Sequence, residues 1–220
     1  MYMLKSMHTQ FSRLRHYKLD VDSVTSITYR GRQDNSSATV EIIRVDADKL
    51  RIHIARVDTR GTETKYMDLL VCFDGVSVRG YDAITKHSVE GTVKRNDALT
   101  ATLSLLAQSM PGQLTGYLFT EKLTPYDHMQ MERTGHVRTL TTSGGRFHIL
   151  THNNRELVLR ARALPLPQSE TIAVPAKVDV RVNYRWDLNS KSPLSAFQFS
   201  PPPQSKRVED FAAFLQSAHY

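Results

Sequence analysis

The sequence has little cysteine and lacks any long apolar run. Cys72 is the single cysteine among 220 residues, which excludes an internal disulfide. It lies in the apolar segment LLVCF, where we interpret it as a buried, inert thiol. No segment approaches the roughly 18 consecutive apolar residues that a membrane-spanning helix requires. The first residues also lack the apolar stretch of a signal peptide, and we expect a periplasmic or otherwise exported protein whose leader is absent from this sequence.

A clustered basic segment is also missing. The formal net charge of +7 would suit an anionic partner such as nucleic acid or an anionic membrane surface. The 29 lysines and arginines, however, never form a run of five, a pattern typical of a solvated sheet exterior. The predicted strands place their aromatic residues with the aliphatic ones and away from the arginines, which does not favour a stacking platform for single-stranded nucleic acid. We therefore expect no nucleic-acid partner, and an anionic membrane surface stays open as a partner.

The motifs of common enzymes are absent as well. The chain has neither a nucleophile elbow nor a phosphate-binding loop. Its nine histidines lack the close cysteine or carboxylate neighbours of a zinc site, so we expect no metal and no cofactor. Asp127, His128 and Glu132 form the best small cluster of chemically active residues. An enzyme centred on these three is one rival hypothesis, but a loop or fraying strand is the better explanation of the cluster, and we expect no catalytic residues.

What is present is a long series of alternating apolar residues. Period-two alternation predicts strands at residues 23–30, 38–45, 49–57, 65–73 and 76–81. The connections between them are too short to hold crossover helices, so these strands must form an antiparallel meander. Further strands are predicted in HVRTLTT, RFHILTH, ELVLRARAL, TIAV, KVDVRVNYRWDL and AFQFS. In the longest of these, one face carries Val178, Val180, Val182, Tyr184 and Trp186.

Three short amphipathic helices accompany the strands. Their apolar stripes predict helices at residues 3–17, 97–110 and 207–217. The fold class is therefore α+β and mostly antiparallel: a single curved sheet of about ten strands, covered by two or three short helices, in one domain spanning residues 1–220. So wide a sheet must curl over its apolar face. The outcome is either a packed core between sheet and helices or a leftover hydrophobic cavity.

Three segments, in order along the chain, resemble the LolA-like periplasmic lipoprotein carriers. VEIIRVDADKLRIHI at residues 40–54 is similar to the strand, arginine, turn and strand that open the sheet of these carriers. VCFDGVSVRGYD at residues 71–82 resembles their strand, Asp-Gly turn and strand. FQFSPPPQSKRVED at residues 197–210 resembles their final strand, in which Phe-x-Phe precedes a Pro-Pro segment. The longer C-terminal half is closer to the uncharacterised periplasmic relatives than to the dedicated carrier.

The resemblance implies a half-open barrel that shelters acyl chains beneath a lid of helices. Arg44 occupies the place of the family's lid-holding arginine, although Val45 stands where the family has proline and this turn is longer. We expect a monomeric, non-enzymatic protein that binds, and in that role transports, a lipid or lipoprotein acyl chain. The predicted ligand-binding residues are Arg44, Leu50, Ile52, Ile54, Leu99, Leu103, Leu106, Tyr184, Trp186, Phe197 and Phe199. The alternative is an envelope sensor or protein-interaction module with the same fold, which contacts other envelope proteins.

Overall fold

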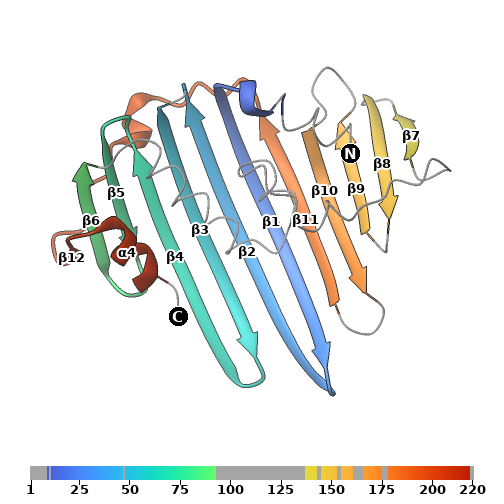
Figure 1. Ribbon diagram of the computed structural model, residues 1–220, viewed down its shortest axis with the longest axis horizontal. Coiled ribbons are helices and arrows are strands. Elements are labelled where there is room, and N and C mark those ends of the chain that lie inside the picture. The colour runs from blue at the N-terminus through green and yellow to red at the C-terminus, as the bar shows by residue number, and fades with distance from the viewer. Residues whose placement is uncertain are drawn as a thin grey trace.

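The structure, a computed structural model, describes residues 9, 11–46, 48–92, 137–142, 145–152, 155–160, 166–174 and 178–218. Within them, twelve strands form one sheet in the order β12-β6-β5-β4-β3-β2-β1-β11-β10-β9-β8-β7 (Figure 1). The strands are β1 (His16–Tyr29), β2 (Arg32–Val45), β3 (Lys49–Arg60), β4 (Glu63–Phe73), β5 (Ser77–Asp82), β6 (His87–Thr92), β7 (Val137–Thr142), β8 (Gly145–His152), β9 (Arg155–Arg160), β10 (Leu166–Val174), β11 (Val178–Asp187) and β12 (Lys206–Val208). The expected curved, mostly antiparallel sheet with few helices is confirmed.

Short turns produce the antiparallel meander from β1 to β6. Arg30 and Gly31 join β1 to β2 with φ angles of 50° and 79°. Both values lie in the left-handed region, as a two-residue hairpin turn of the favoured hand requires. Between β4 and β5, the Asp74 carboxylate accepts hydrogen bonds from the backbone N–H groups of Val76 and Ser77 at 3.0 and 2.8 Å. The polar residues of the connections thus direct each strand back beside the previous one.

Two pairings between distant segments complete the sheet. β1 pairs with β11 in antiparallel register from Lys18 opposite Asp187 to Ile27 opposite Val178. This pairing joins the meander to the second half of the chain. β12 pairs with β6 in parallel, the one parallel pairing among the described strands. The sequence pattern predicted individual strands, whereas these two pairings depend on contacts between residues that are far apart in the chain.

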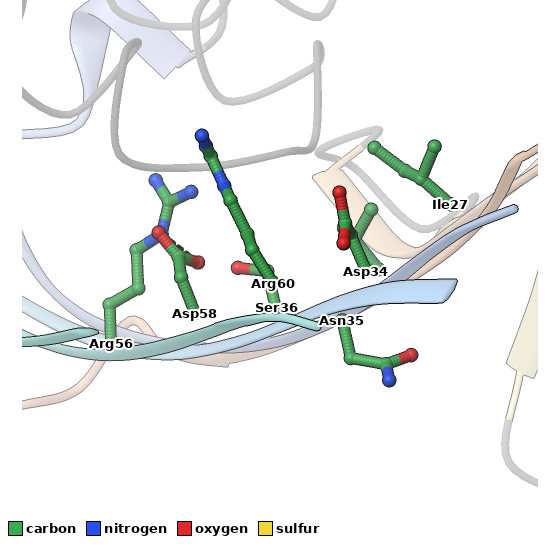
Figure 2. A pocket seen from close by; sticks show the side chains of 8 residues that line it. Ile27, Asp34, Asn35, Ser36, Arg56, Asp58 and Arg60 are labelled. Carbon is green, nitrogen blue, oxygen red and sulfur yellow. Dashed lines mark hydrogen bonds and ion pairs between the residues drawn. The ribbon is translucent and has the colours of Figure 1, made fainter. Parts of the chain in front are cut away.

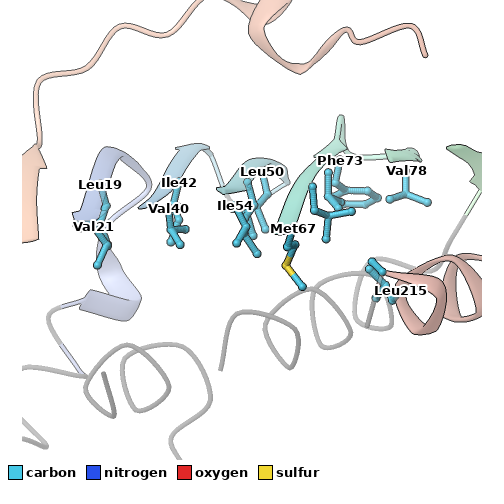
Figure 3. Packing of buried hydrophobic residues seen from close by; sticks show 14 of the residues in the cluster. Leu19, Val21, Val40, Ile42, Leu50, Ile54, Met67, Phe73, Val78 and Leu215 are labelled. Carbon is cyan, nitrogen blue, oxygen red and sulfur yellow. The ribbon is translucent and has the colours of Figure 1, made fainter. Parts of the chain in front are cut away.

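The two faces of the sheet differ in character. We call the face that carries Leu19, Val40, Ile54 and Met67 the inner face; these side chains project from one side of the strands, the side on which Leu215 of α4 (Phe211–Ser217) lies (Figure 3). The opposite, outer face carries cross-strand ion pairs. In these pairs, Lys18 Nζ lies 2.8 Å from Glu41 Oε2, and Arg51 also forms an ion pair with Glu41. Arg79 Nε lies 2.8 Å from Glu90 Oε1.

A segment that we call the strap, residues 188–205, connects β11 to β12 along the outer face (Figure 3). It contains the 3-10 helix η1 (Leu194–Phe197), which contacts β3. Phe197 is buried, and the Phe199 ring lies 6.2 Å from that of Tyr81, which the register places on the outer face. The strap therefore gives the outer face a small apolar core of its own.

Several predicted elements differ from those observed. The segment AFQFS is not a strand, because its alternation is confined between Pro193 and Pro201, and residues 194–197 form η1 instead. The first helix ends before β1, which begins at His16, so Tyr17 lies on a strand. The predicted helix at residues 207–217 divides into β12 and α4, and β6 was not predicted. The predicted helix at residues 97–110 lies outside the described residues.

Candidate functional site

The inner face presents apolar rows that run across the sheet at right angles to the strands. In one row the cross-strand partners are, in order, Trp186, Leu19, Ile42, Ile52, Val71, Gly80 and Val89. In the next row they are Tyr184, Val21, Val40, Ile54 and Leu69. Trp186 is partly buried and the other side chains in the two rows are buried. Because successive residues of a strand alternate between faces, this apolar surface follows from the period-two pattern.

The structure brings together part of the predicted ligand-binding set. Leu50, Ile52 and Ile54 of β3 belong to one inner-face cluster with Tyr184, and Trp186 packs against it. Arg44 lies on the same face because it pairs with Tyr17 on one side and Leu50 on the other. Leu99, Leu103 and Leu106 lie outside the described residues.

Phe197 and Phe199 are placed elsewhere. Both belong to the strap on the outer face, and Phe197 is buried without joining the inner-face cluster. The structure therefore does not bring these two phenylalanines together with Tyr184 and Trp186. All four side chains come from apolar alternations near the end of the chain, and this local pattern does not distinguish the two faces of the sheet.

Three aromatic rings occupy one end of the inner face. Phe11 and Tyr17 lie 5.4 Å apart between ring centroids, and each lies 5.8 Å from Trp186. Burial raises the pKa of Tyr17 to about 12, against the opposing effect of the Arg44 guanidinium. The tyrosine therefore stays neutral at physiological pH, and this end of the face is an apolar aromatic wall with Arg44 beside it.

A buried carboxyl group also belongs to this face. Glu170 of β10 is fully buried, and the hydroxyl of Tyr184 donates a hydrogen bond to its Oε2 atom at 3.4 Å. Glu170 pairs with Val182 across the sheet, which places it on the inner face. The ring of Tyr184 thus forms part of the apolar face, while its hydroxyl group is hydrogen-bonded to the buried Glu170.

The sequence pattern did not identify the polar end of the inner face. Thr25, Ser36, Arg56, Asp58 and Arg60 line a pocket of about 250 Å³ near the turns that join β1 to β2 and β3 to β4 (Figure 2). The signal that could have found them is the continuation of the same alternation: Ser36 has the same parity along β2 as Val40 and Ile42. At this end of the strands the members of the alternation are polar, so hydrophobic periodicity does not reveal them.

No metal centre is found in the part of the chain that the structure describes. No group of three or more histidine, cysteine or acidic residues there could hold a metal ion. Cys72 is buried, and burial raises the pKa of its thiol to about 11, which agrees with an inert role. Asp127, His128 and Glu132 lie outside the described residues. Nor does any described helix have the length and apolar character needed to cross a bilayer.

Comparisons with known proteins give similarity only to solved structures. No protein-family model and no curated protein match the chain. An uncharacterised conserved protein from Thermus thermophilus is 9% identical with a TM-score of 0.38, over 95% of this chain and 98% of that one. A LolA superfamily protein from Nitrosomonas europaea is 9% identical with a TM-score of 0.35, over 89% and 96%. A DUF1329 family protein from Desulfovibrio piger is 10% identical with a TM-score of 0.32, over 88% and 96%. The solved structures to which this chain is similar thus include a member of the superfamily that its sequence motifs resemble.

Proposed function

We propose that the inner face binds the apolar chain of a lipid or lipoprotein. The observation that carries this proposal is the unbroken apolar surface across β11, β1, β2, β3 and β4, formed by two neighbouring rows of side chains. Among the described elements, helix α4 packs mainly on β5, β6 and β12, which lie beside this surface. An extended apolar face of this width is suited to a long, flexible chain rather than to a compact polar substrate.

Desolvation of the apolar chain supplies the main part of the binding free energy. Each buried methylene contributes about 0.8 kcal/mol, so a 16-carbon chain gains on the order of 10 kcal/mol before the loss of chain entropy. No catalytic group is needed, and the protein acts as a binder or carrier rather than an enzyme. The proposed contacts are Leu50, Ile52, Ile54, Tyr184 and Trp186 among the described residues, with Arg44 at the margin and Leu99, Leu103 and Leu106 as further predicted contacts.

A chain-length series tests this proposal. Saturated fatty acids of increasing length compete with a fluorescent fatty acid for the purified protein, and each added methylene should tighten binding by roughly threefold to fourfold. This slope reports transfer of the chain from water to an apolar surface. A series that shows no dependence on chain length, or a protein that takes up no probe, would contradict the proposal.

The proposal has two further parts, the location of the protein and its domain organisation. A carrier of acyl chains works in the aqueous space between membranes, so we place this protein in the periplasm as an exported monomer. The pairing of β1 with β11 links the two halves of the chain in one sheet, which supports a single domain over residues 1–220. A single cooperative unfolding transition that is independent of protein concentration is the expected result.

A second candidate function is docking to another protein through the outer face. Val24, Ser37, Val57 and Tyr66 follow one another across β1 to β4 on this face. Val24 and Tyr66 are 58% and 53% exposed, and with Ile84 they border an open depression of about 460 Å³. Exposed apolar groups that gather in this way are typical of interaction surfaces.

Site-specific photocrosslinking in the native host tests this second candidate. A crosslinker in place of Tyr66 should give one discrete protein adduct, whereas a crosslinker in place of the exposed Tyr29, at the far end of β1, should give none. Equal labelling at both positions, or no adduct at Tyr66, would remove docking through this surface as a function.

A further inference from the structure

The inner face changes from apolar to polar along β1, β2 and β3. Thr25 of β1 lies opposite Ser36 of β2, which in turn lies opposite Asp58 of β3. In the next row outward, Asp34 lies opposite Arg60. Figure 2 shows Asp34, Arg56, Asp58 and Arg60 projecting from the same side of these strands, whereas Asn35 projects from the other side. The register therefore places this polar group on the same face as the apolar rows.

Two hydroxyl groups in this polar region have no partner among the described residues. Thr25 is 7% exposed, and its Oγ1 atom is fully buried without a hydrogen bond. Ser36 lies directly opposite on the neighbouring strand, and its Oγ atom is also buried without a hydrogen bond. Both residues line the pocket of about 250 Å³. A buried hydroxyl without a partner is destabilising, so two that face one pocket indicate a ligand that accepts hydrogen bonds there.

The arginines of this region are not equivalent. The Nε atom of Arg56 lies 2.8 Å from Asp58 Oδ1, and both side chains are largely buried. Asp34 is paired in the same way by Arg32, whose Nε lies 2.8 Å from Asp34 Oδ1. Arg60 lines the pocket, is exposed, and has no ion pair within the described part of the chain.

The charges near the pocket leave a net positive excess. Arg32, Arg56 and Arg60 face the two carboxylates of Asp34 and Asp58, an excess of one positive charge. Strand β4 adds one cation and one anion on the same face, because Lys65 lies opposite Asp58 and Glu63 lies opposite Arg60. The excess of one positive charge is therefore unchanged. The pocket is thus suited to an anionic group that Arg60 neutralises.

We propose that this pocket receives the anionic head group of the amphiphile whose chain lies on the apolar rows. The shared chemistry is a carboxylate or phosphate that accepts hydrogen bonds from Thr25 and Ser36 and faces the Arg60 guanidinium. Between Tyr17 and Thr25, β1 spans about 26 Å at roughly 3.3 Å per residue, a length that accommodates an extended long acyl chain. This assignment rests on the proposed function and names its ligand class as an anionic amphiphile rather than a neutral lipid.

The test compares a fluorescent fatty acid with its methyl ester, which has the same chain and no charge. The wild-type protein should bind the acid about tenfold more tightly than the ester, the usual effect of one charge-assisted contact. Arg60→Gln should weaken acid binding and leave ester binding unchanged. Thr25→Val should weaken acid binding more than ester binding, because a carboxylate accepts a stronger hydrogen bond than an ester carbonyl. Arg181→Gln is the matched control, because Arg181 is an exposed arginine whose cross-strand position lies on the outer face.

The outcomes separate the pocket from the proposed function. If acid and ester bind equally well, and Arg60→Gln changes neither affinity, the head-group assignment is wrong while binding of the apolar chain stands. If neither probe binds, the proposed function fails and the assignment fails with it. Inorganic phosphate provides a further test. Phosphate that competes weakly with the acid, and does not compete with the ester, supports a head-group pocket. Phosphate that binds as tightly as the acid identifies a site for a free anion and overturns the assignment.

Discussion

Phe214 of α4 lies directly against the backbone of Gly80 in β5. A Cβ atom on Gly80 would come within 2.5 Å of Phe214 Cε1 and 2.9 Å of its Cζ atom. Phe214 itself is fully buried. The absence of a side chain at Gly80 is therefore what allows α4 to cover the β5 and β6 edge of the inner face.

Gly80→Ala should destabilise the protein by about 2 kcal/mol, because the added methyl group overpacks the contact with Phe214. Chemical denaturation measures this change. Phe214→Leu in the Gly80→Ala background should recover part of the loss, since the smaller side chain makes room. If the two changes are additive, the residues do not interact as described.

The strap provides a second, independent prediction on the outer face. Phe197 is 1% exposed and Leu194, in the same 3-10 helix, is 61% exposed. Phe197→Ala should lower the free energy of unfolding by about 3 to 5 kcal/mol, whereas Leu194→Ala should change it by less than about 0.5 kcal/mol. Urea denaturation of both variants makes the comparison. Similar small effects would mean that the strap does not pack on the sheet.

High pH should weaken the fold through two buried groups. Burial raises the pKa of Cys72 from 9.0 to about 11 and that of Tyr17 from 10.0 to about 12. Each raised pKa means that the folded state holds the proton more tightly than the unfolded state. The stability from these groups is therefore complete below about pH 9 and is lost as the pH rises through 11 and 12.

Cys72→Ala isolates the thiol contribution. Between pH 9 and 11 the free energy of unfolding should fall less steeply in Cys72→Ala than in the wild type. Denaturant titrations at several pH values provide the two slopes. Equal slopes would show that Cys72 titrates alike in the folded and unfolded chains, contrary to its burial.

The sequence was most informative where a strand is buried on one face and solvated on the other. In β11, Val180, Val182 and Tyr184 are buried while Arg181 and Asn183 are exposed, as the alternation predicts. The short turns likewise predicted the meander. Both features depend on neighbouring residues, which a single sequence shows directly.

The sequence was least informative where distant segments decide the structure. Phe197 and Phe199 alternate like a strand, but Pro193 and Pro201 flank them, and in the strap the Phe199 ring lies 6.2 Å from that of Tyr81 in β5. The start of β1 resembles part of a helix in the sequence, because Phe11 and Leu14 fit a helical spacing that continues to Tyr17. The polar pocket requires the register between β1, β2 and β3, which no local pattern contains.

The central claim is that the inner face, and not the outer face, binds the apolar chain. Ile42 and Ile43 are neighbours in β2, and both are buried, at 0% and 7% exposure, but they point to opposite faces. Ile42→Ala and Ile43→Ala should each destabilise the protein by about 2 to 5 kcal/mol, so they form a matched pair. The direct measurement is the affinity of each variant for a fluorescent fatty acid, under conditions in which circular dichroism shows both to be folded. The account predicts binding weakened roughly tenfold in Ile42→Ala and unchanged in Ile43→Ala. Equal affinities for both variants and the wild type would contradict it.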